Sequence, residues 1–519
     1  MAGVAVATPD FDLHLVRDPF HSPGGESHGK ILRMEIGITG FGAYIPRLRL
    51  ARKAVFDANG WFSPGLRSLA KGERAIANWD EDAVTMAVEA ARDCLTGVDR
   101  AGLKGLYLAS TSYPFDDRQN SGIVAQALNL ESGISVLDVA ASQRAGTSGL
   151  IAALQAARGG GGPILVVAAD KRRTKSASPQ ELSYGDGATA LLVGGGAPLA
   201  ARFLGAHSET VDFVDHYRGH GRDFDYGWEE RWIRDEGFLK IVPKAVQVLF
   251  RKTGVEPSGI AHFCMPAAMA RVAQSVAKLV GLPETSVRDN LQAQCGETGV
   301  AHPLLMLVHA LENARPGERI LVIGFGQGSD ALLFEAGEGL ATLAKRQGVA
   351  GSLARRKEET NYNRYLAFND LVAMERGLRS EVDKQTALSA LYRKREMLLG
   401  LVGGRCSQCG TLQFPKSNIC VNPNCNAIGT QENQPFADLS ARVMSYTADQ
   451  LTYSPDPPQC YGMVTFAEGG RMMADFTDVA GAKVEVGMPM RMVFRIKEID
   501  TARGFARYFW KAAPAAKET

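Results

Sequence analysis

"DVAASQRAGTSGLIAALQAA", residues 138 to 157, has the pattern of a buried strand that runs straight into a helix, with small residues crowded at the turn. Many enzymes place a nucleophile at such a turn, because the first amide groups and the dipole of the helix stabilise negative charge there. The turn here carries Ser142, Gln143 and Arg144. Glutamine is not a nucleophile, so the stretch predicts a charge-stabilising site without the usual attacking group.

Strands and helices alternate around this stretch. Helical spacing behind an acidic first turn is found in "DEDAVTMAVEAARDCL" (80–95), whereas "GLYLAST" (105–111), "GGPILVVAAD" (161–170) and "RILVIGFGQG" (319–328) are apolar runs typical of strands. This alternation favours an α/β layered fold. The last two runs share their pattern and their glycine-rich surroundings, which hints at an internal duplication.

Composition narrows the class of protein. The 519 residues suffice for two or three domains with real cores, and the net charge of +2 indicates neither a nucleic-acid-binding nor a membrane-surface protein. Glycine and charged residues interrupt every apolar run before it reaches the length of a membrane span, and the N-terminus lacks the basic-then-apolar order of a secretory signal. The cysteine usage suits metal binding in a reducing compartment. We therefore expect a cytoplasmic protein without nucleic-acid or membrane partners.

Four of the eight cysteines form one cluster. Two residues separate Cys406 from Cys409, four separate Cys420 from Cys425, and ten separate the two pairs. Two close pairs of soft thiolates can close one tetrahedral site, for which zinc is the natural occupant. No histidine or open ligand position is evident nearby, so we predict a structural zinc that fixes the start of the following module.

Composition and periodicity divide the chain into five segments. The expected segments are a flexible N-terminal extension (1–33), an α/β domain (34–340), a charged helical linker (341–385), a cysteine-bearing module (386–430) and a small antiparallel barrel (431–519). The barrel is predicted from runs such as "ARVMSYTADQL" and "FARYFWKAA", which alternate with a period of about two and are separated by glycine or proline turns.

Residues 35 to 340 resemble the 3-hydroxy-3-methylglutaryl-CoA synthase branch of the thiolase superfamily, particularly its archaeal-type enzymes. The stretches that carry the resemblance are "GITGFGAYIPRLRL", "SYGDGATALLVGG", "TVDFVDHYRGHGRDF" and "GFGQGSDALLFE". Residues 385 to 515 resemble the DUF35 module, a rubredoxin-like zinc ribbon followed by an OB-fold. The resemblance implies a five-layered αβαβα thiolase-like fold, CoA thioesters as substrates and a homodimer formed through the thiolase-like domain.

The positions that carry chemistry in this family have changed. Counting from the family's motifs, the acyl-accepting Cys falls on Gln143, the Glu that acts as general acid or base falls on Thr111, the catalytic His falls on Pro266 and the polarising Asn falls on Glu297. An ordinary synthase reaction through an acyl-enzyme is therefore not expected. We instead expect an acyl-CoA enzyme acting on a carbon–carbon bond β to the thioester, by retro-aldol or retro-Claisen cleavage or by decarboxylation.

Candidate residues for this chemistry lie in two stretches. Gln143 can donate a hydrogen bond to an enolate oxygen at the helix N-terminus. Glu297 can act as a general base or acid if burial raises its pKa towards neutrality. His302, in "AHPL", is similar in context to the carbonyl-polarising His of true thiolases, or is a packed helix residue. Thr111 and Tyr113 are candidates from one loop, with Tyr113 as a proton donor or a packing residue.

Two alternatives remain open. The first is an acyltransferase or synthase that uses a displaced nucleophile, Cys295 or Cys264; the second is a noncatalytic acyl-CoA-binding scaffold for a partner enzyme. For CoA we expect contacts from Arg144 and Arg271, and an oxyanion hole completed by the glycine amides near Gly326.

Overall fold

A nine-stranded sheet runs through the N-terminal domain, with strand order β11-β12-β13-β8-β1-β7-β6-β4-β5. The computed structural model describes residues 35–196, 198–375, 385–479 and 483–515; the predicted extension 1–33 lies outside these described residues. The strands of the sheet are β1 (Ile36–Tyr44), β4 (Gly105–Ala109), β5 (Ser135–Val139), β6 (Ile164–Asp170), β7 (Gly187–Gly195), β8 (Ala201–Thr210), β11 (Ile260–Cys264), β12 (Arg319–Phe325) and β13 (Gly328–Ala336).

The sheet consists of two equivalent halves. From the centre outwards, one half runs β1-β7-β6-β4-β5 and the other runs β8-β13-β12-β11. The two runs that look alike in sequence form β6 and β12, which hold the same position in their halves. Among the described residues no fifth strand lies beside β11, where a single parallel bridge between Phe263 and Val287 stands in its place. The topology therefore supports the internal duplication that the sequence suggests.

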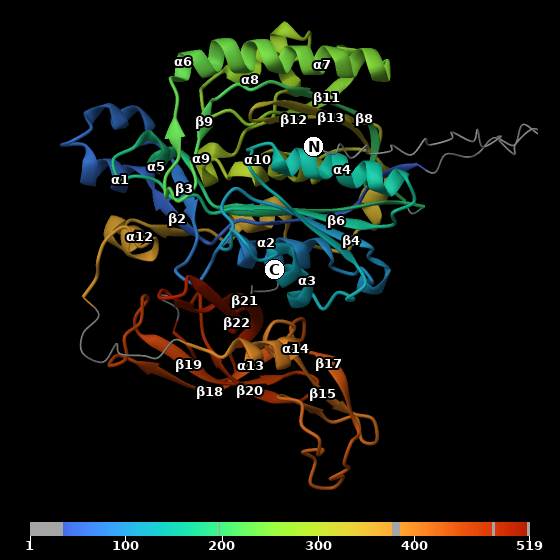
Figure 1. Cartoon of the computed structure of the whole chain (residues 1–519), viewed down its shortest axis with the longest axis vertical. Helices are drawn as coiled ribbons and strands as arrows, with labels where there is room; N and C mark the ends of the chain where they lie inside the picture. Colours follow the sequence, from blue (N-terminus) through green and yellow to red (C-terminus); the bar gives the residue numbers. More distant parts are fainter. Residues whose placement is uncertain (1–34, 197, 376–384, 480–482, 516–519) are drawn as a thin grey trace, which may run out of the picture. The chain divides into compact units, whose positions relative to one another are not determined.

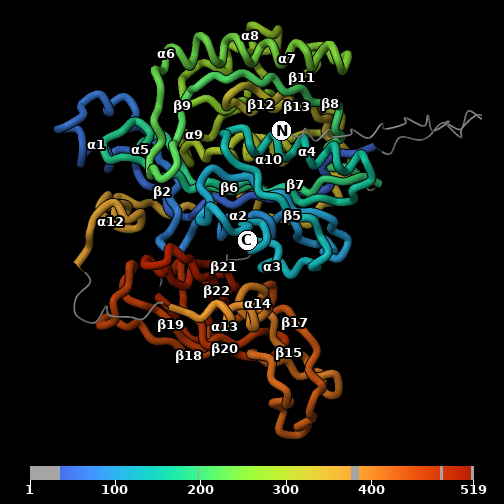
Figure 2. Tube along the Cα trace, in the orientation of Figure 1, coloured from blue at the N-terminus to red at the C-terminus, as the bar shows by residue number. Residues whose placement is uncertain are grey.

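The two halves are joined at β1 and β8 by only two residue pairs, Gly37 with Arg202 and Ile38 with Ala201. They fold over one another and enclose two helices, which contact strands of both halves. The helices of the middle layer are α4 (Ala145–Arg158) and α10 (His302–Leu311). One outer layer contains α2 (Ala83–Cys94) and α3 (Asn120–Ala127), and the other contains α7 (Leu239–Thr253) and α8 (Val272–Leu279). Figures 1 and 2 show the resulting αβαβα order, which confirms the expected fold class.

Helix α2 illustrates how the local sequence sets these elements. Asp82 caps the helix in a reciprocal pair with Thr85, since each side chain accepts a hydrogen bond of 2.8 Å from the other residue's backbone N–H. Ten of its twelve residues are buried because β1, β6 and β7 cover one face and the C-terminal barrel covers another.

The segment 341–385, predicted as a helical linker, contains two short helices and also a strand. Its elements are α11 (Gly348–Ala354), β14 (Lys357–Glu359) and α12 (Tyr362–Phe368). Strand β14 pairs in parallel with β2 (Leu48–Ala51), which also pairs with β3 (Glu73–Ile76). Much of the segment therefore belongs to the N-terminal domain. The other short elements of this domain are α1 (Arg52–Asn59), α5 (Pro179–Ser183), β9 (His216–Tyr217), β10 (Tyr226–Gly227), α6 (Glu230–Trp232) and α9 (Gln292–Cys295).

The C-terminal module begins with two short helices, α13 (Leu388–Arg393) and α14 (Arg395–Leu398). Three strands make the ribbon sheet, namely β15 (Val402–Cys406), β16 (Leu412–Gln413) and β17 (Gln431–Pro435), so the ribbon extends past the predicted boundary at 430. The OB-fold sheet has the order β20-β19-β18-β21-β22, with β18 (Ala441–Asp449), β19 (Gln459–Phe466), β20 (Arg471–Asp475), β21 (Pro489–Asp500) and β22 (Phe505–Pro514).

The barrel packs on α2 and on the loop that precedes it. One apolar core cluster contains residues of α2 and α3 together with barrel residues such as Phe494 and Trp510. Buried charges complete the contact: Lys511 Nζ lies 2.9 Å from an Asp80 carboxylate oxygen, and the Arg495 guanidinium lies 2.9 Å from Glu81. In the part of the chain described here, no helix has the length and apolar character needed to cross a bilayer.

Candidate active site

The Gln143 turn, residues 140–144, connects edge strand β5 to helix α4. The turn is fixed against the β12–β13 turn, because the Ser142 hydroxyl donates a 3.0 Å hydrogen bond to the Gly326 carbonyl. A Cβ on Gly326 would lie 2.9 Å from Ser142 Oγ and 3.1 Å from the backbone N of Gln143, so this close approach requires glycine. Within the described residues, neither the side-chain amide nor the backbone N–H of half-buried Gln143 has a hydrogen-bond partner. Both are available at the positive end of a fourteen-residue helix.

The second amide at this place comes from Gln327 rather than Gly326. The Gly326 N–H donates to the Gly328 carbonyl at 3.1 Å, so it is not available for an oxyanion, contrary to the prediction. Gln327 follows with a positive φ of 47°, and its backbone N–H has no acceptor among the residues that the structure describes. Gln143 and Gln327 therefore each have a backbone N–H without a partner among the described residues.

Arg144 has a structural partner. Its guanidinium lies 3.1 Å from the buried carboxylate of Asp330, which also accepts hydrogen bonds from Thr147, Ser148 and Ser208. The predicted CoA contact of Arg144 conflicts with this ion pair, because the charge is already compensated inside the protein. Arg271, by contrast, is exposed at the start of α8 with a φ of 63°, and its predicted contact with CoA stays a prediction.

Thr111 and Tyr113 are held by backbone and carboxylate groups. The Thr111 hydroxyl donates to Asp170 at 3.0 Å, and the same buried carboxylate accepts the N–H groups of Thr111 and Val300. Tyr113 donates to the Leu108 and Val139 carbonyls, and burial raises its phenol pKa above the ordinary value. This geometry favours the packing role for Tyr113 over that of proton donor.

Glu297 is paired with Arg172, which makes it a poor general base. One carboxylate oxygen contacts the Arg172 guanidinium and the other accepts the Gly299 N–H at 2.8 Å. Burial favours a higher pKa for Glu297, but the positive charge of Arg172 prevails and lowers it. A role for Glu297 as general base or acid required a pKa raised towards neutrality, and the structure does not provide it. The cause is Arg172, which is itself only 4% exposed.

His302 is a packed helix residue in this structure. Its side chain is 0% exposed, its Nδ1 accepts the Thr298 N–H at 3.0 Å, and its Nε2 donates to the Asn290 carbonyl at 2.7 Å. Burial lowers its imidazole pKa, so both nitrogens are occupied in the neutral form. Of the two roles left open for His302, the geometry supports packing over polarisation of a thioester carbonyl.

The displaced nucleophiles are also buried. Cys264 and Cys295 are 0% exposed, and burial raises the pKa of each thiol to about 12. The Cys295 thiol donates to the Leu291 carbonyl at 3.3 Å and the Cys264 thiol to the Met306 carbonyl at 3.5 Å. Nucleophilic cysteines are accessible thiolates, so this environment disfavours the acyltransferase alternative.

Sequence reasoning missed a group of polar residues on the 211–232 segment, which includes the β9–β10 pair. Asp215 accepts a hydrogen bond from the Gln327 side chain at 3.3 Å and is paired with His216 at 2.8 Å. Arg218 donates to the Thr111 carbonyl and lies 2.8 Å from Asp225, which is itself 3.9 Å from Arg172. The segment therefore connects the Gln143 side of the site to the Arg172–Glu297 side. The only sequence signal was the density of His, Asp and Arg in "DHYRGHGRDFD".

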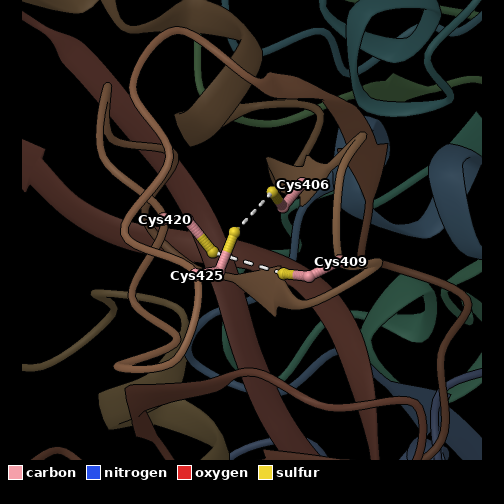
Figure 3. Close-up of side chains that lie close together, drawn as sticks. All are labelled: Cys406, Cys409, Cys420 and Cys425. Carbon is pink, nitrogen blue, oxygen red and sulfur yellow. Dashed lines mark hydrogen bonds between the residues drawn. The ribbon is translucent and has the colours of Figure 1, made fainter.

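The four predicted zinc ligands come together in the ribbon, as Figure 3 shows. Their Sγ atoms all lie within 4.8 Å of one another, with 3.9 Å between Cys406 and Cys425 and 3.5 Å between Cys409 and Cys420. Four thiolates around zinc, at Zn–S bonds of about 2.3 Å, are separated by about 3.8 Å. The sulfur geometry therefore fits a tetrahedral zinc ion.

Three segments of the chain match described families. Residues 250–334 match the 3-oxoacyl-(acyl-carrier-protein) synthase III C terminal, residues 399–427 the ChsH2 rubredoxin-like zinc ribbon domain, and residues 434–495 the ChsH2 C-terminal OB-fold domain.

Whole-protein relatives extend these matches over most of the N-terminal domain. The hydroxymethylglutaryl-CoA synthase of Aeropyrum pernix is 30% identical over 306 residues, which cover 58% of this chain and 84% of that protein. The enzyme of the same name from Methanosarcina mazei is 29% identical over 341 residues, or 64% of this chain and 97% of that one. A crystal structure of HMG-CoA synthase complexed with CoA has the same fold, with a TM-score of 0.58 at 19% identity over 68% of this chain and 95% of that chain. The chain thus belongs to the hydroxymethylglutaryl-CoA synthase family, extended by a ChsH2-type zinc ribbon and OB-fold.

Proposed function

We propose that the protein is an acyl-CoA enzyme that cleaves a carbon–carbon bond β to the thioester without forming an acyl-enzyme. The observation that carries this proposal is the Gln143 turn, where the family resemblance places a thiol. Its Gln143 side-chain amide and backbone N–H, and the backbone N–H of Gln327 on the adjacent β12–β13 turn, have no partner among the described residues. Amide donors fixed before the reaction stabilise an oxyanion strongly, because they need no reorganisation when the charge develops.

The burial of the candidate nucleophiles favours cleavage over acyl transfer. Gln143 cannot attack a thioester, and the thiols of Cys264 and Cys295 are buried and held in the protonated form. In cleavage, the thioester takes up the electron pair of the broken bond as an enolate. The amides of Gln143 and Gln327 would stabilise the enolate oxygen by hydrogen bonds. Retro-aldol cleavage and decarboxylation need no attacking group, whereas retro-Claisen cleavage needs water or CoA as the nucleophile.

The zinc ion and CoA have separate roles in this proposal. The four cysteines would hold zinc as a structural ion, because all four ligand positions are taken by protein sulfur. CoA would carry the acyl group into the site, as a thioester whose oxygen meets the amides of the turn. The relative solved with CoA supports this choice of carrier.

We further propose a homodimer formed through the N-terminal domain. Strand β5 ends the nine-stranded sheet, and its Leu137 is 44% exposed. An open strand edge next to the Gln143 turn is suited to pair with a second copy. Light scattering should find a dimer, and a charged substitution, Leu137→Lys, should shift it towards monomer.

The proposed reaction is tested with a panel of β-hydroxyacyl-, β-ketoacyl- and malonyl-CoA thioesters, with products identified by mass spectrometry. Gln143→Ala should lower kcat by about 10²-fold, in the range measured for loss of one oxyanion donor. Gln155→Ala, an exposed change on the same helix α4, is the matched control and should not alter turnover. Cys264→Ala and Cys295→Ala should both keep activity, whereas an acyl adduct on either thiol would refute the proposal. Binding of CoA without turnover of any thioester would leave the scaffold alternative.

A further inference from the structure

His216 and Asp215 form an oriented pair at the start of β9. The Asp215 carboxylate lies 2.8 Å from the His216 Nδ1, so Nδ1 carries the proton and Nε2 presents its lone pair. Within the described residues, Nε2 has no hydrogen-bond partner, and 18% of the His216 side chain is exposed. The imidazole is therefore oriented on one side and available on the other.

Asp215 is hydrogen-bonded to Gln327, whose backbone N–H has no partner among the described residues. Its second carboxylate oxygen accepts the Gln327 side-chain amide at 3.3 Å, and its backbone carbonyl accepts the Trp228 N–H at 3.0 Å. Gln327 directly follows Gly326, which is in contact with the Gln143 turn. One side chain thus connects the His216–Asp215 pair to the amide donors.

The charged groups around His216 come from three segments. Asp215 stands on its own segment, Arg172 follows β6, and Asp225 precedes β10. Burial and Arg172 favour a lower pKa for His216, but the hydrogen bond and negative charge of Asp215, helped by Asp225, raise it above the ordinary histidine value. Such an imidazole can take up a proton and return it near neutral pH.

The other titratable candidates of the site lack this freedom. Both nitrogens of His302 are bound to backbone groups, and both oxygens of Glu297 are bound to Arg172 and Gly299. We propose that His216 is the general acid–base of the site, oriented by Asp215; this inference rests on the proposed cleavage function.

The chemical step can be written for a β-hydroxyacyl-CoA. Nε2 of His216 takes the proton of the β-hydroxyl, the O–H electron pair becomes the second bond of a carbonyl, and the Cα–Cβ bond breaks. Its electron pair moves into the thioester as an enolate, whose oxygen accepts hydrogen bonds from the amides of Gln143 and Gln327. The imidazolium then gives the proton to Cα, so the products are an aldehyde or ketone and a shortened acyl-CoA.

The first test compares His216→Gln with His220→Gln in the full-length protein. His220 is an exposed histidine on the same segment, so its substitution controls for a general loosening of the loop. His216→Gln should lower kcat by about 10²-fold or more with unchanged binding of CoA, and added imidazole should restore part of the rate. Asp215→Asn should also lower kcat and should change the pH profile, because it no longer fixes the tautomer. Full turnover by His216→Gln would overturn the proposal.

A second measurement separates this inference from the proposed function. Acetyl-CoA carries a thioester but no β-carbon to cleave, so its effect on the histidine NMR signals does not require turnover. The histidine signals that disappear in the His216→Gln variant belong to His216. In the wild type, addition of acetyl-CoA should shift these signals, and a lack of any shift would overturn the inference. If these signals shift while no thioester of the panel is cleaved, the proposed function fails and His216 remains the group that faces the thioester.

Discussion

The Glu89 carboxylate provides a quantitative test of how the C-terminal barrel is held on the N-terminal domain. Glu89 lies in α2, and its oxygens lie 3.0 Å from Arg92, 2.9 Å from Arg491 and 3.2 Å from the Phe494 N–H. Burial favours a higher pKa, but the three guanidinium groups of Arg92, Arg491 and Arg495 prevail and lower the pKa of Glu89 from about 4.5 to about 2.

This shift fixes the sign of the pH dependence. The folded protein holds the carboxylate more strongly than the unfolded chain does, so the stabilisation is present above pH 4.5 and is lost as the pH falls towards 2. A difference of about 2.5 pKa units corresponds to about 3 kcal/mol of unfolding free energy at neutral pH. Glu89→Gln keeps the shape of the side chain and should remove a contribution of this order.

The assay is urea unfolding of the wild type and of Glu89→Gln at several pH values from 7 down to 3.5. The difference in unfolding free energy between the two proteins should shrink by about 1.4 kcal/mol over this range, because the Glu89 carboxyl becomes protonated in the unfolded chain while it stays ionised in the folded protein. Glu468→Gln, at an exposed carboxyl of the same barrel, is the control and should give no pH-dependent difference. A constant difference between the wild type and Glu89→Gln across the range would refute the reasoning.

Three further predictions follow from contacts described above. Arg495→Ala leaves Glu81 and its neighbours buried without their guanidinium and should cost about 3–5 kcal/mol. Arg234→Ala, at the exposed pair with Asp235, should leave the unfolding free energy nearly unchanged; urea unfolding of both variants measures this. Gly326→Ala forces a methyl group against the Gln143 turn and should destabilise the protein by about 1–3 kcal/mol, while Gly65→Ala, which faces open space, should not lower the melting temperature. Chelation of zinc should lower the melting temperature of the C-terminal module and release about one zinc ion per chain, as counted by elemental analysis. If chelation has neither effect, the prediction of a structural zinc is wrong.

The sequence predicts those parts of the fold whose signal is local. Helix α2 follows from its apolar spacing and its cap, and the zinc ligands follow from their spacing along the chain. Strand β17 was missed because its residues, "QENQP", are polar and mostly exposed, and the strand is defined by its pairing with β15 rather than by an apolar pattern. The order of the layers came only from the family resemblance, because periodicity does not say which strands pair.

The candidate site likewise contains one part that a local sequence pattern predicts and other parts that depend on residues far apart in the chain. The Gln143 turn is readable because a strand, a turn and a helix follow one another within twenty residues. The partner of Glu297 is Arg172, 125 positions away, and the link from Asp215 to Gln327 spans 112 positions. No single-sequence pattern indicates such pairs, so the titration behaviour of Glu297 and the orientation of His216 emerge only from the folded chain.

The apolar cluster shared by α2, α3 and the barrel has a consequence for how this chain can evolve. The apolar interior of the barrel is not separate from the N-terminal domain, since side chains such as Phe494 and Trp510 belong to the same cluster as those of α2. An exchange of the C-terminal module for one from another protein would need matching changes on α2 and on the loop before it, where Asp80 and Glu81 meet Lys511 and Arg495. We therefore expect the two parts to be inherited together, and substitutions in one to be compensated in the other.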